Sequence, residues 1–164
     1  MTKKSLILFL FFIIFAAVVS AQPKTGYGED FWFSVGAETA LYESTDYAYG
    51  GSFMLGFGTG TSIGIRTVWF FNSNHMEVFE LIFFFRYYLH GLTSNSGPFL
   101  QVMGGTSLFH GYGGLSIPFD LGTFSAGLSF GWRFIFSDRW FIEPAVRAGY
   151  PFLIGAGVSA GVRF

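Results

Sequence analysis

Large apolar residues and small or polar residues alternate along most of the chain with a period of two. Residues 124–136 show the pattern most clearly, because seven apolar residues share one parity while Ser, Gly and Arg occupy most of the other. Successive side chains of a β-strand point to opposite faces, so each such stretch is expected to be a strand with one strongly apolar face. Eight stretches follow the pattern, at about 29–41, 48–57, 61–71, 77–89, 98–109, 121–136, 140–150 and 153–164.

Turn-forming residues separate these stretches. Gly58-Thr59-Gly60 and Ser137-Asp138-Arg139 are short enough to close hairpins, whereas residues 91–97 and 110–120 form longer connections. No linker and no second type of pattern divides the chain. Residues 22–164 are therefore expected to form a single all-β domain.

Two closed-sheet architectures are compatible with this alternation. In a soluble barrel the apolar face points inward, and the outer face must be rich in charged residues. Here the second face is mostly Gly, Ser and Ala, and charged residues make up 12% of the chain, against about 25% in a typical soluble domain. Small residues suit the narrow lumen of an eight-stranded barrel, and a sheet in lipid must close to satisfy its backbone. We therefore expect an eight-stranded antiparallel transmembrane β-barrel whose large apolar residues face lipid.

The first 21 residues have the features of a secretory signal peptide. Lys3 and Lys4 precede an unbroken apolar run at residues 6–19, and small residues follow it. We place the cleavage between Ala21 and Gln22, with export through the Sec pathway. The alternative is a membrane-spanning helix, which needs about 20 apolar residues, more than this run contains.

Composition excludes several functional classes. Removing Lys3 and Lys4 leaves seven of the nine basic residues against ten acidic ones, with no basic run to bind nucleic acid. The chain has no cysteine, which excludes disulfides and thiolate chemistry. Its three histidines are scattered and do not form a metal-binding motif. We expect no cofactor and no bound metal.

The inward parity collects most of the charged residues of the expected strands. Charges at membrane depth almost always face the interior, where they pair or reach water. If residues 137–139 form a three-residue turn, Arg133 lies directly opposite Glu143. Across the separate turn at Asn72-Ser73-Asn74, Arg66 and Glu80 should be diagonal neighbours. The expected lumen ion-pair network comprises Glu38, Arg66, Glu80, Arg86, Arg133, Glu143, Arg147 and Arg163.

This lumen has two interpretations. In the first, the ion pairs fill the lumen, an interpretation that inward Trp32, Phe70, Phe84 and Phe141 favour. In the second, the many inward glycines leave a narrow pore, and five positive against three negative charges favour anions.

The end of the chain resembles the C-terminal signal of bacterial outer-membrane proteins. It finishes on Phe, with apolar residues at every second position before it: Val158, Ala160, Val162 and Phe164. With the signal peptide and eight strands, the chain resembles small outer-membrane barrels of the OmpA, OmpX and OmpW type, and residues 141–150 are similar to OmpA-like families. The resemblance implies an outer-membrane monomer that contacts lipid and is inserted by the barrel-assembly machinery.

The expected function is a structural role in the cell envelope, without catalysis. A narrow pore or an OmpW-like transporter of small molecules is the alternative, and a lipid-modifying enzyme comes third. The enzyme hypothesis depends on His110, with Ser107, Ser116 and Asp120 as the other candidates for a triad.

Two local features complete the expectations. Pro144 faces lipid in mid-strand and lacks a donor, so we expect a β-bulge there. Aromatic residues should form a girdle at each membrane interface. The girdle near the termini would hold Phe31, Phe57, Tyr87, Phe99, Phe134, Phe136, Trp140 and Phe164, and the outer one Tyr42, Tyr49, Trp69, Phe71, Phe109, Tyr112 and Tyr150.

Overall fold

The computed structural model describes residues 31–42, 46–72, 76–89, 96–111, 122–136 and 139–164. They form eight strands: β1 Phe31–Tyr42, β2 Asp46–Phe57, β3 Thr61–Asn72, β4 Met76–Tyr88, β5 Gly97–Gly111, β6 Gly122–Phe136, β7 Trp140–Tyr150 and β8 Phe152–Arg163. Each observed bound lies within two residues of the expected one. The expected signal peptide, its expected cleavage point and residues 112–120 of the longest connection lie outside the described residues.

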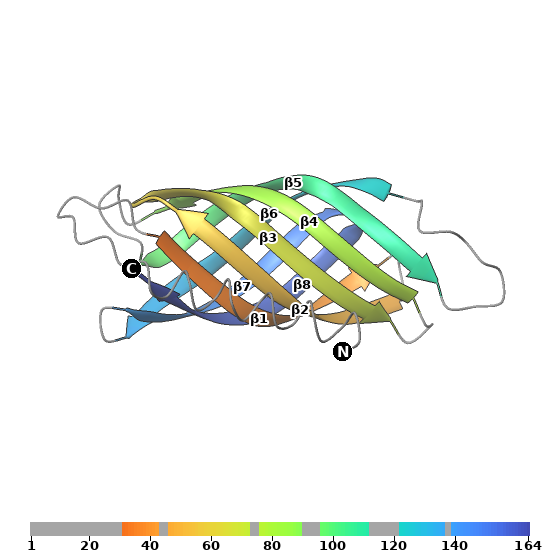
Figure 1. Ribbon diagram of the computed structural model, residues 1–164, viewed down its shortest axis with the longest axis horizontal. Helices are drawn as coiled ribbons and strands as arrows, with labels where there is room; N and C mark the ends of the chain where they lie inside the picture. The colour runs from red at the N-terminus through yellow and green to blue at the C-terminus, as the bar shows by residue number, and fades with distance from the viewer. Residues whose placement is uncertain (1–30, 43–45, 73–75, 90–95, 112–121, 137–138) are drawn as a thin grey trace, which may run out of the picture.

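The strands close into one antiparallel barrel. Each strand pairs with its neighbours in sequence, and β1 pairs with β8 (Figure 1). This confirms the expected eight-stranded antiparallel barrel. Closure gives every strand two partners, as a sheet in lipid requires. The described residues contain no helix that is both long and apolar enough to cross a bilayer.

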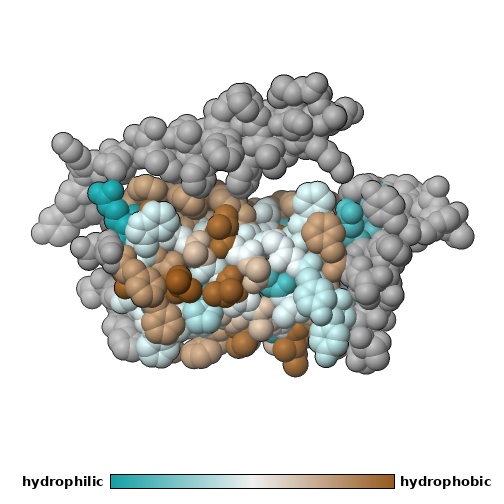
Figure 2. All heavy atoms as spheres, turned by 90° about the horizontal axis from the view of Figure 1, so that it is seen from below, coloured by the Kyte–Doolittle hydropathy of each residue, from teal (hydrophilic) through white to brown (hydrophobic). Residues whose placement is uncertain are grey.

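The two faces of the sheet differ as the alternation predicted. On the outer wall Phe83, Phe124 and Trp140 expose 62%, 68% and 60% of their surface. Apolar and aromatic side chains predominate on the side of the wall seen in Figure 2. In the lumen Arg86 and Glu143 expose only 1% and 2%. Most large apolar residues therefore lie outside and most charges of the strands inside, the reverse of a water-soluble protein.

The expected bulge at Pro144 is wrong. The β6–β7 register is the same on both sides of Pro144, and the β7–β8 register passes through it without a shift. Pro lacks a backbone donor, and the β6–β7 pairing is interrupted only between the Gly131–Ala145 and Phe134–Ile142 pairs.

A register shift occurs instead at the start of β8. Leu41 pairs with Ile154 while Tyr42 pairs with Phe152, so Leu153 is an extra residue. Both Leu153 and Ile154 are consequently exposed, and Phe152 turns into the lumen. Sequence alternation alone does not reveal this reversal.

The girdles are only partly as expected. At the end that carries the C-terminus, the ring of Phe31 packs against those of Phe57 and Phe164. At the opposite end Trp69 and Phe71 stack on the outer wall. Phe99, however, is buried inside the barrel, and Tyr42 and Phe109 pack against the buried cluster at the outer mouth. Their parity places them on the inward face of the sheet. They therefore do not join the girdles on the outer wall, although they lie near the ends of the barrel.

Candidate functional site in the barrel lumen

A three-residue charged cluster lies in the half of the lumen nearer the C-terminus. Glu143 on β7 accepts hydrogen bonds at Oε1 from Arg86 Nη1, at 2.6 Å, and from Nε of Arg133 on β6. The structure thus brings Arg133 and Glu143 together across the hairpin that follows Phe136. Arg86 comes from β4, which neighbours neither of these strands in the sheet. The cluster therefore spans the lumen.

Aromatic rings surround both guanidinium groups of this cluster. The Arg133 guanidinium lies 3.8 Å from the ring centre of Phe141 and 4.2 Å from that of Trp32. The Arg86 guanidinium lies 3.9 Å from the ring centre of Phe99. Aromatic faces attract cations, most strongly where water is excluded. The rings thus compensate part of the charge that one carboxylate leaves on two arginines.

Arg86 also has neutral partners, among them the Met54 thioether, 3.9 Å from its Nη2. Its Nε donates to Gln101 Oε1 at 2.9 Å, and its Nη1 also donates to the Tyr88 hydroxyl at 3.1 Å. Sequence reasoning did not select Gln101 or Tyr88. Both share the inward parity with the charged residues, so strict use of the alternation would have found them.

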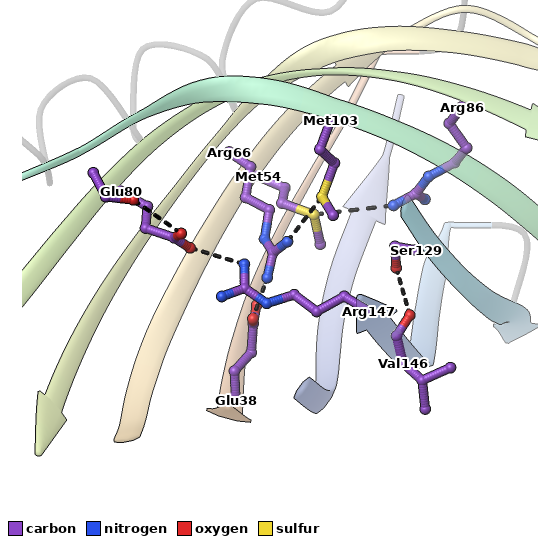
Figure 3. Close-up of polar contacts among 10 residues, drawn as sticks. Glu38, Met54, Arg66, Glu80, Arg86, Met103, Ser129, Val146 and Arg147 are labelled. Carbon is purple, nitrogen blue, oxygen red and sulfur yellow. Dashed lines mark hydrogen bonds and ion pairs between the residues drawn. The ribbon is translucent and has the colours of Figure 1, made fainter. Parts of the chain in front are cut away.

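Two further ion pairs occupy the middle of the lumen (Figure 3). Arg66 on β3 donates to Glu38 on β1 and, through Nη1, to the Met103 thioether at 3.1 Å. Arg147 Nη1 on β7 donates to Glu80 Oε2 on β4 at 2.8 Å. The expected diagonal placement of Arg66 and Glu80 is observed, since Arg66 lies opposite Ile82. Arg66 and Glu80 form no ion pair with each other, because Arg66 pairs with Glu38 and Glu80 pairs with Arg147.

Arg163 lies apart from these clusters. It is half-buried at the end of β8, directly opposite Trp32. The structure therefore brings seven of the eight expected charged residues into four ion pairs and places Arg163 at the rim.

An aromatic layer lies at the outer mouth of the lumen. The rings of Phe70 and Phe152 are 4.5 Å apart, and Tyr42 packs edge-on against Phe152. The Arg147 guanidinium lies 5.1 Å from the ring centre of Phe70 and 5.2 Å from that of Phe152. This layer covers the Arg147–Glu80 pair from the outer side.

Inward glycines accommodate the lumen rings. Five aromatic residues lie directly opposite a glycine on the neighbouring strand: Trp32 and Gly56, Phe70 and Gly50, Phe84 and Gly64, Phe99 and Gly131, and Phe141 and Gly161. A Cβ at any of these glycines would lie 2.3–2.8 Å from the facing ring. These glycines therefore provide the space that the rings occupy.

Two small cavities remain beside Arg147. One of about 40 Å³ lies toward Arg86 and Glu143, and the other of about 20 Å³ lies toward Glu80 and Phe152. A water molecule needs about 10–15 Å³ of such volume. The two cavities, which the Arg147 side chain separates, together have room for a few water molecules.

The residues proposed for a catalytic triad do not come together in the described residues. Ser107 is buried in the lumen, where its hydroxyl donates to Glu80 Oε1 at 3.2 Å. His110 lies three positions further along β5 and has the opposite parity. Ser116 and Asp120 lie outside the described residues. No group of His, Asp and Glu side chains that could hold a metal is found in the part of the chain that the structure describes.

Solved structures with a similar fold include two natural barrels and one design. Neisserial surface protein A has a TM-score of 0.66 and 15% identity, over 81% of this chain and 95% of that protein. The N-terminal β-barrel domain of Pseudomonas aeruginosa OprF has a TM-score of 0.52 and 16% identity, over 81% and 97%. The chain has the fold of small outer-membrane β-barrels.

The designed protein TMB2.3 matches this outer-membrane barrel fold as well, with a TM-score of 0.51 and 11% identity over 85% of this chain and 98% of the design. The sequence matches no protein-family model and no curated protein. At these identities the likeness is one of fold, so the role of this barrel has to be argued from its own side chains.

Proposed function

We propose that the protein is a structural component of the bacterial outer membrane and that its own side chains close its lumen. The cluster of Arg86, Glu143 and Arg133 supports this most strongly. It ties β4 to β6 and β7 across the lumen, and the rings of Trp32 and Phe141 pack around it. Buried charges that are this completely enclosed favour a fixed packing arrangement over an ion path.

The small size of the cavities argues in the same direction. A conducting pore needs a continuous aqueous path, whereas the two cavities beside Arg147 have volumes of about 40 and 20 Å³. The aromatic layer of Phe70 and Phe152 lies beyond them at the outer mouth. A pore is therefore the less favoured alternative.

A transporter with a lateral opening is also less favoured. Such a protein needs an apolar passage from the lumen through the wall. The β4–β5 pairing runs without a shift from Met76 and Gly111 to Tyr88 and Phe99, and Glu80 and Arg147 make the adjacent lumen polar. The enzyme hypothesis loses its main support because Ser107 and His110 have opposite parity.

Export and assembly belong to the same proposal. The Sec signal at residues 1–21 would deliver the chain to the periplasm. The segment ending in Val158, Ala160, Val162 and Phe164 would be recognised by the barrel-assembly machinery, after which the protein would act as a monomer in contact with lipid. Exposed Val158 and Ala160 on the outer wall, and the Phe164 ring packed against Phe31, are compatible with that role.

Planar-bilayer recording tests the proposed closure. The wild-type protein should give no stable unitary currents. A Trp32→Ala, Phe70→Ala, Phe141→Ala variant removes the rings from above Gly56, Gly50 and Gly161, in both the charged cluster and the outer aromatic layer, and should conduct. Trp132→Ala, which removes an outward ring, is the matched control and should stay silent. Folding of each variant is checked on a gel, where the folded and heat-unfolded forms should migrate apart. Stable unitary currents from the folded wild type would overturn the proposal.

A further inference from the structure

The outer wall of β3, β4 and β5 carries a shallow apolar groove of about 670 Å³. None of the described residues that line it is charged. Its outward-facing side chains are Phe57, Ile63, Ile65, Phe83, Phe85 and Val102, and Gly104 interrupts them on β5.

The missing side chain at Gly104 opens this groove. Ile63, Phe85 and Val102 are paired directly across the three strands and form a continuous bulky row. In the next row Phe83 lies opposite Gly104. A Cβ added at Gly104 would meet nothing within 4 Å. The wall thus recedes beside the protruding ring of Phe83.

The groove lies in the leaflet nearer the chain termini. Phe57, at one end of the groove, is the last residue of β2 and is paired with Phe31, whose carbonyl accepts a hydrogen bond from the backbone N–H of Phe164. We place the chain termini on the periplasmic side, so in an outer membrane this leaflet faces the periplasm and consists of phospholipid. One step nearer the rim Thr61 lies opposite Tyr87, so two outward hydroxyl-bearing residues lie beside the mouth of the groove.

We propose that this groove is a binding site for one acyl chain of a phospholipid of the periplasmic leaflet. Within a bilayer, association depends on van der Waals packing and not on exclusion of water, so shape decides what binds. A concave surface beside the projecting rings of Phe83 and Phe85 fits a thin flexible chain better than the flat wall of a second barrel. The hydroxyls of Thr61 and Tyr87 lie where the glycerol ester and headgroup of such a lipid would be.

Filling the groove tests the proposal. Gly104→Leu places a side chain in open space on the outer wall and closes the groove. Gly51→Leu is the matched control, because Gly51 too lies on the outer wall and a Cβ there would lie 3.9 Å from its nearest neighbour. Each protein is reconstituted in phosphatidylethanolamine vesicles, extracted into mild detergent and examined by native mass spectrometry, with the gel shift as the folding check.

Wild type and Gly51→Leu should retain one phosphatidylethanolamine per barrel, and Gly104→Leu should retain several-fold less. Equal retention by all three folded proteins would overturn the proposal. So would dimers that form in the wild type and Gly51→Leu but not in Gly104→Leu, because the groove would then be a contact between copies of the barrel.

Discussion

The indole ring of Trp32 on β1 lies across Gly56, its directly opposed neighbour on β2, so closely that a Cβ at Gly56 would come within 2.4 Å of the ring. The same relationship recurs at four other positions in the lumen. The pairing of a large ring with a glycine allows a narrow barrel to hold five aromatic side chains in addition to its charges. The space inside the barrel is thus set by pairs of residues on neighbouring strands.

Replacing Gly56 by Ala should destabilise the barrel, because the added methyl group displaces the Trp32 ring. Overpacking of this kind typically lowers the free energy of unfolding by about 1–3 kcal/mol. Urea unfolding in lipid vesicles measures the change. Gly51→Ala, on the outward face of the same strand, should differ from wild type by less than about 0.5 kcal/mol. Equal effects at both positions would show that the ring does not need the glycine.

Replacing Glu143 by Gln should be among the most destabilising single substitutions in the lumen. It leaves Arg86 and Arg133 buried without their shared carboxylate, and breaking a buried ion pair typically lowers the free energy of unfolding by about 3–5 kcal/mol. The same urea titration provides the measurement. The comparison variant is Glu77→Gln, at the half-buried outer end of β4, where a loss below about 1 kcal/mol is expected. A small effect at Glu143 would mean that the aromatic rings alone hold the two arginines.

Glu80 and Arg147 should be energetically coupled across the lumen. Either Glu80→Gln or Arg147→Met leaves one buried charge uncompensated, whereas the double variant removes both charges. The sum of the two single losses in free energy of unfolding should therefore exceed the loss of the double variant by about 1–3 kcal/mol, within the range seen for contacting residues. Glu80→Gln combined with Arg133→Met, which belongs to the other cluster, should be additive within about 0.5 kcal/mol. Additivity in the first pair would argue against the observed hydrogen bond.

A positive charge on the outer wall should be costly in proportion to depth. Phe83→Arg, toward the middle of β4, should lower the free energy of unfolding in vesicles by about 2–4 kcal/mol, and Phe57→Arg, at the end of β2, by at most about 1 kcal/mol. In a soluble barrel, exposed arginines at both positions would be tolerated equally. Two small, equal effects would therefore contradict the assignment of the outer wall to lipid.

The architecture could be predicted from the sequence because alternation is a local signal that every strand repeats. The placement of Arg133 near Glu143 could also be predicted, by counting residues outward from the turn, since a short turn fixes the register of its hairpin. Counting along a hairpin could not predict the pairs of Arg66 with Glu38 and of Arg147 with Glu80. They join strands that are not neighbours, and only the curvature of the closed sheet brings them together.

Local irregularities set the other limit of prediction. The extra residue at Leu153 reverses the parity of Phe152 and places its ring in the lumen, although the surrounding sequence gives no sign of it. At Pro144 the sequence predicts an irregularity that is absent. Proline typically disrupts a strand, but the strand pairing on both sides of β7 keeps its register at this position. The importance of inward glycines was equally hidden, since a glycine beneath a ring and a glycine beside water look the same in a sequence.

The four tryptophans allow the most direct test of which face meets lipid. Trp32 is fully buried in the lumen, whereas Trp132 exposes 41% on the outer wall. Two single-tryptophan proteins, each with the other three replaced by Phe, are reconstituted in vesicles that contain brominated phospholipid, and fluorescence quenching is recorded. The fluorescence of Trp132 should be strongly quenched and that of Trp32 nearly unaffected. Strong quenching of Trp32 with protection of Trp132 would contradict the inside-out arrangement on which the whole account depends.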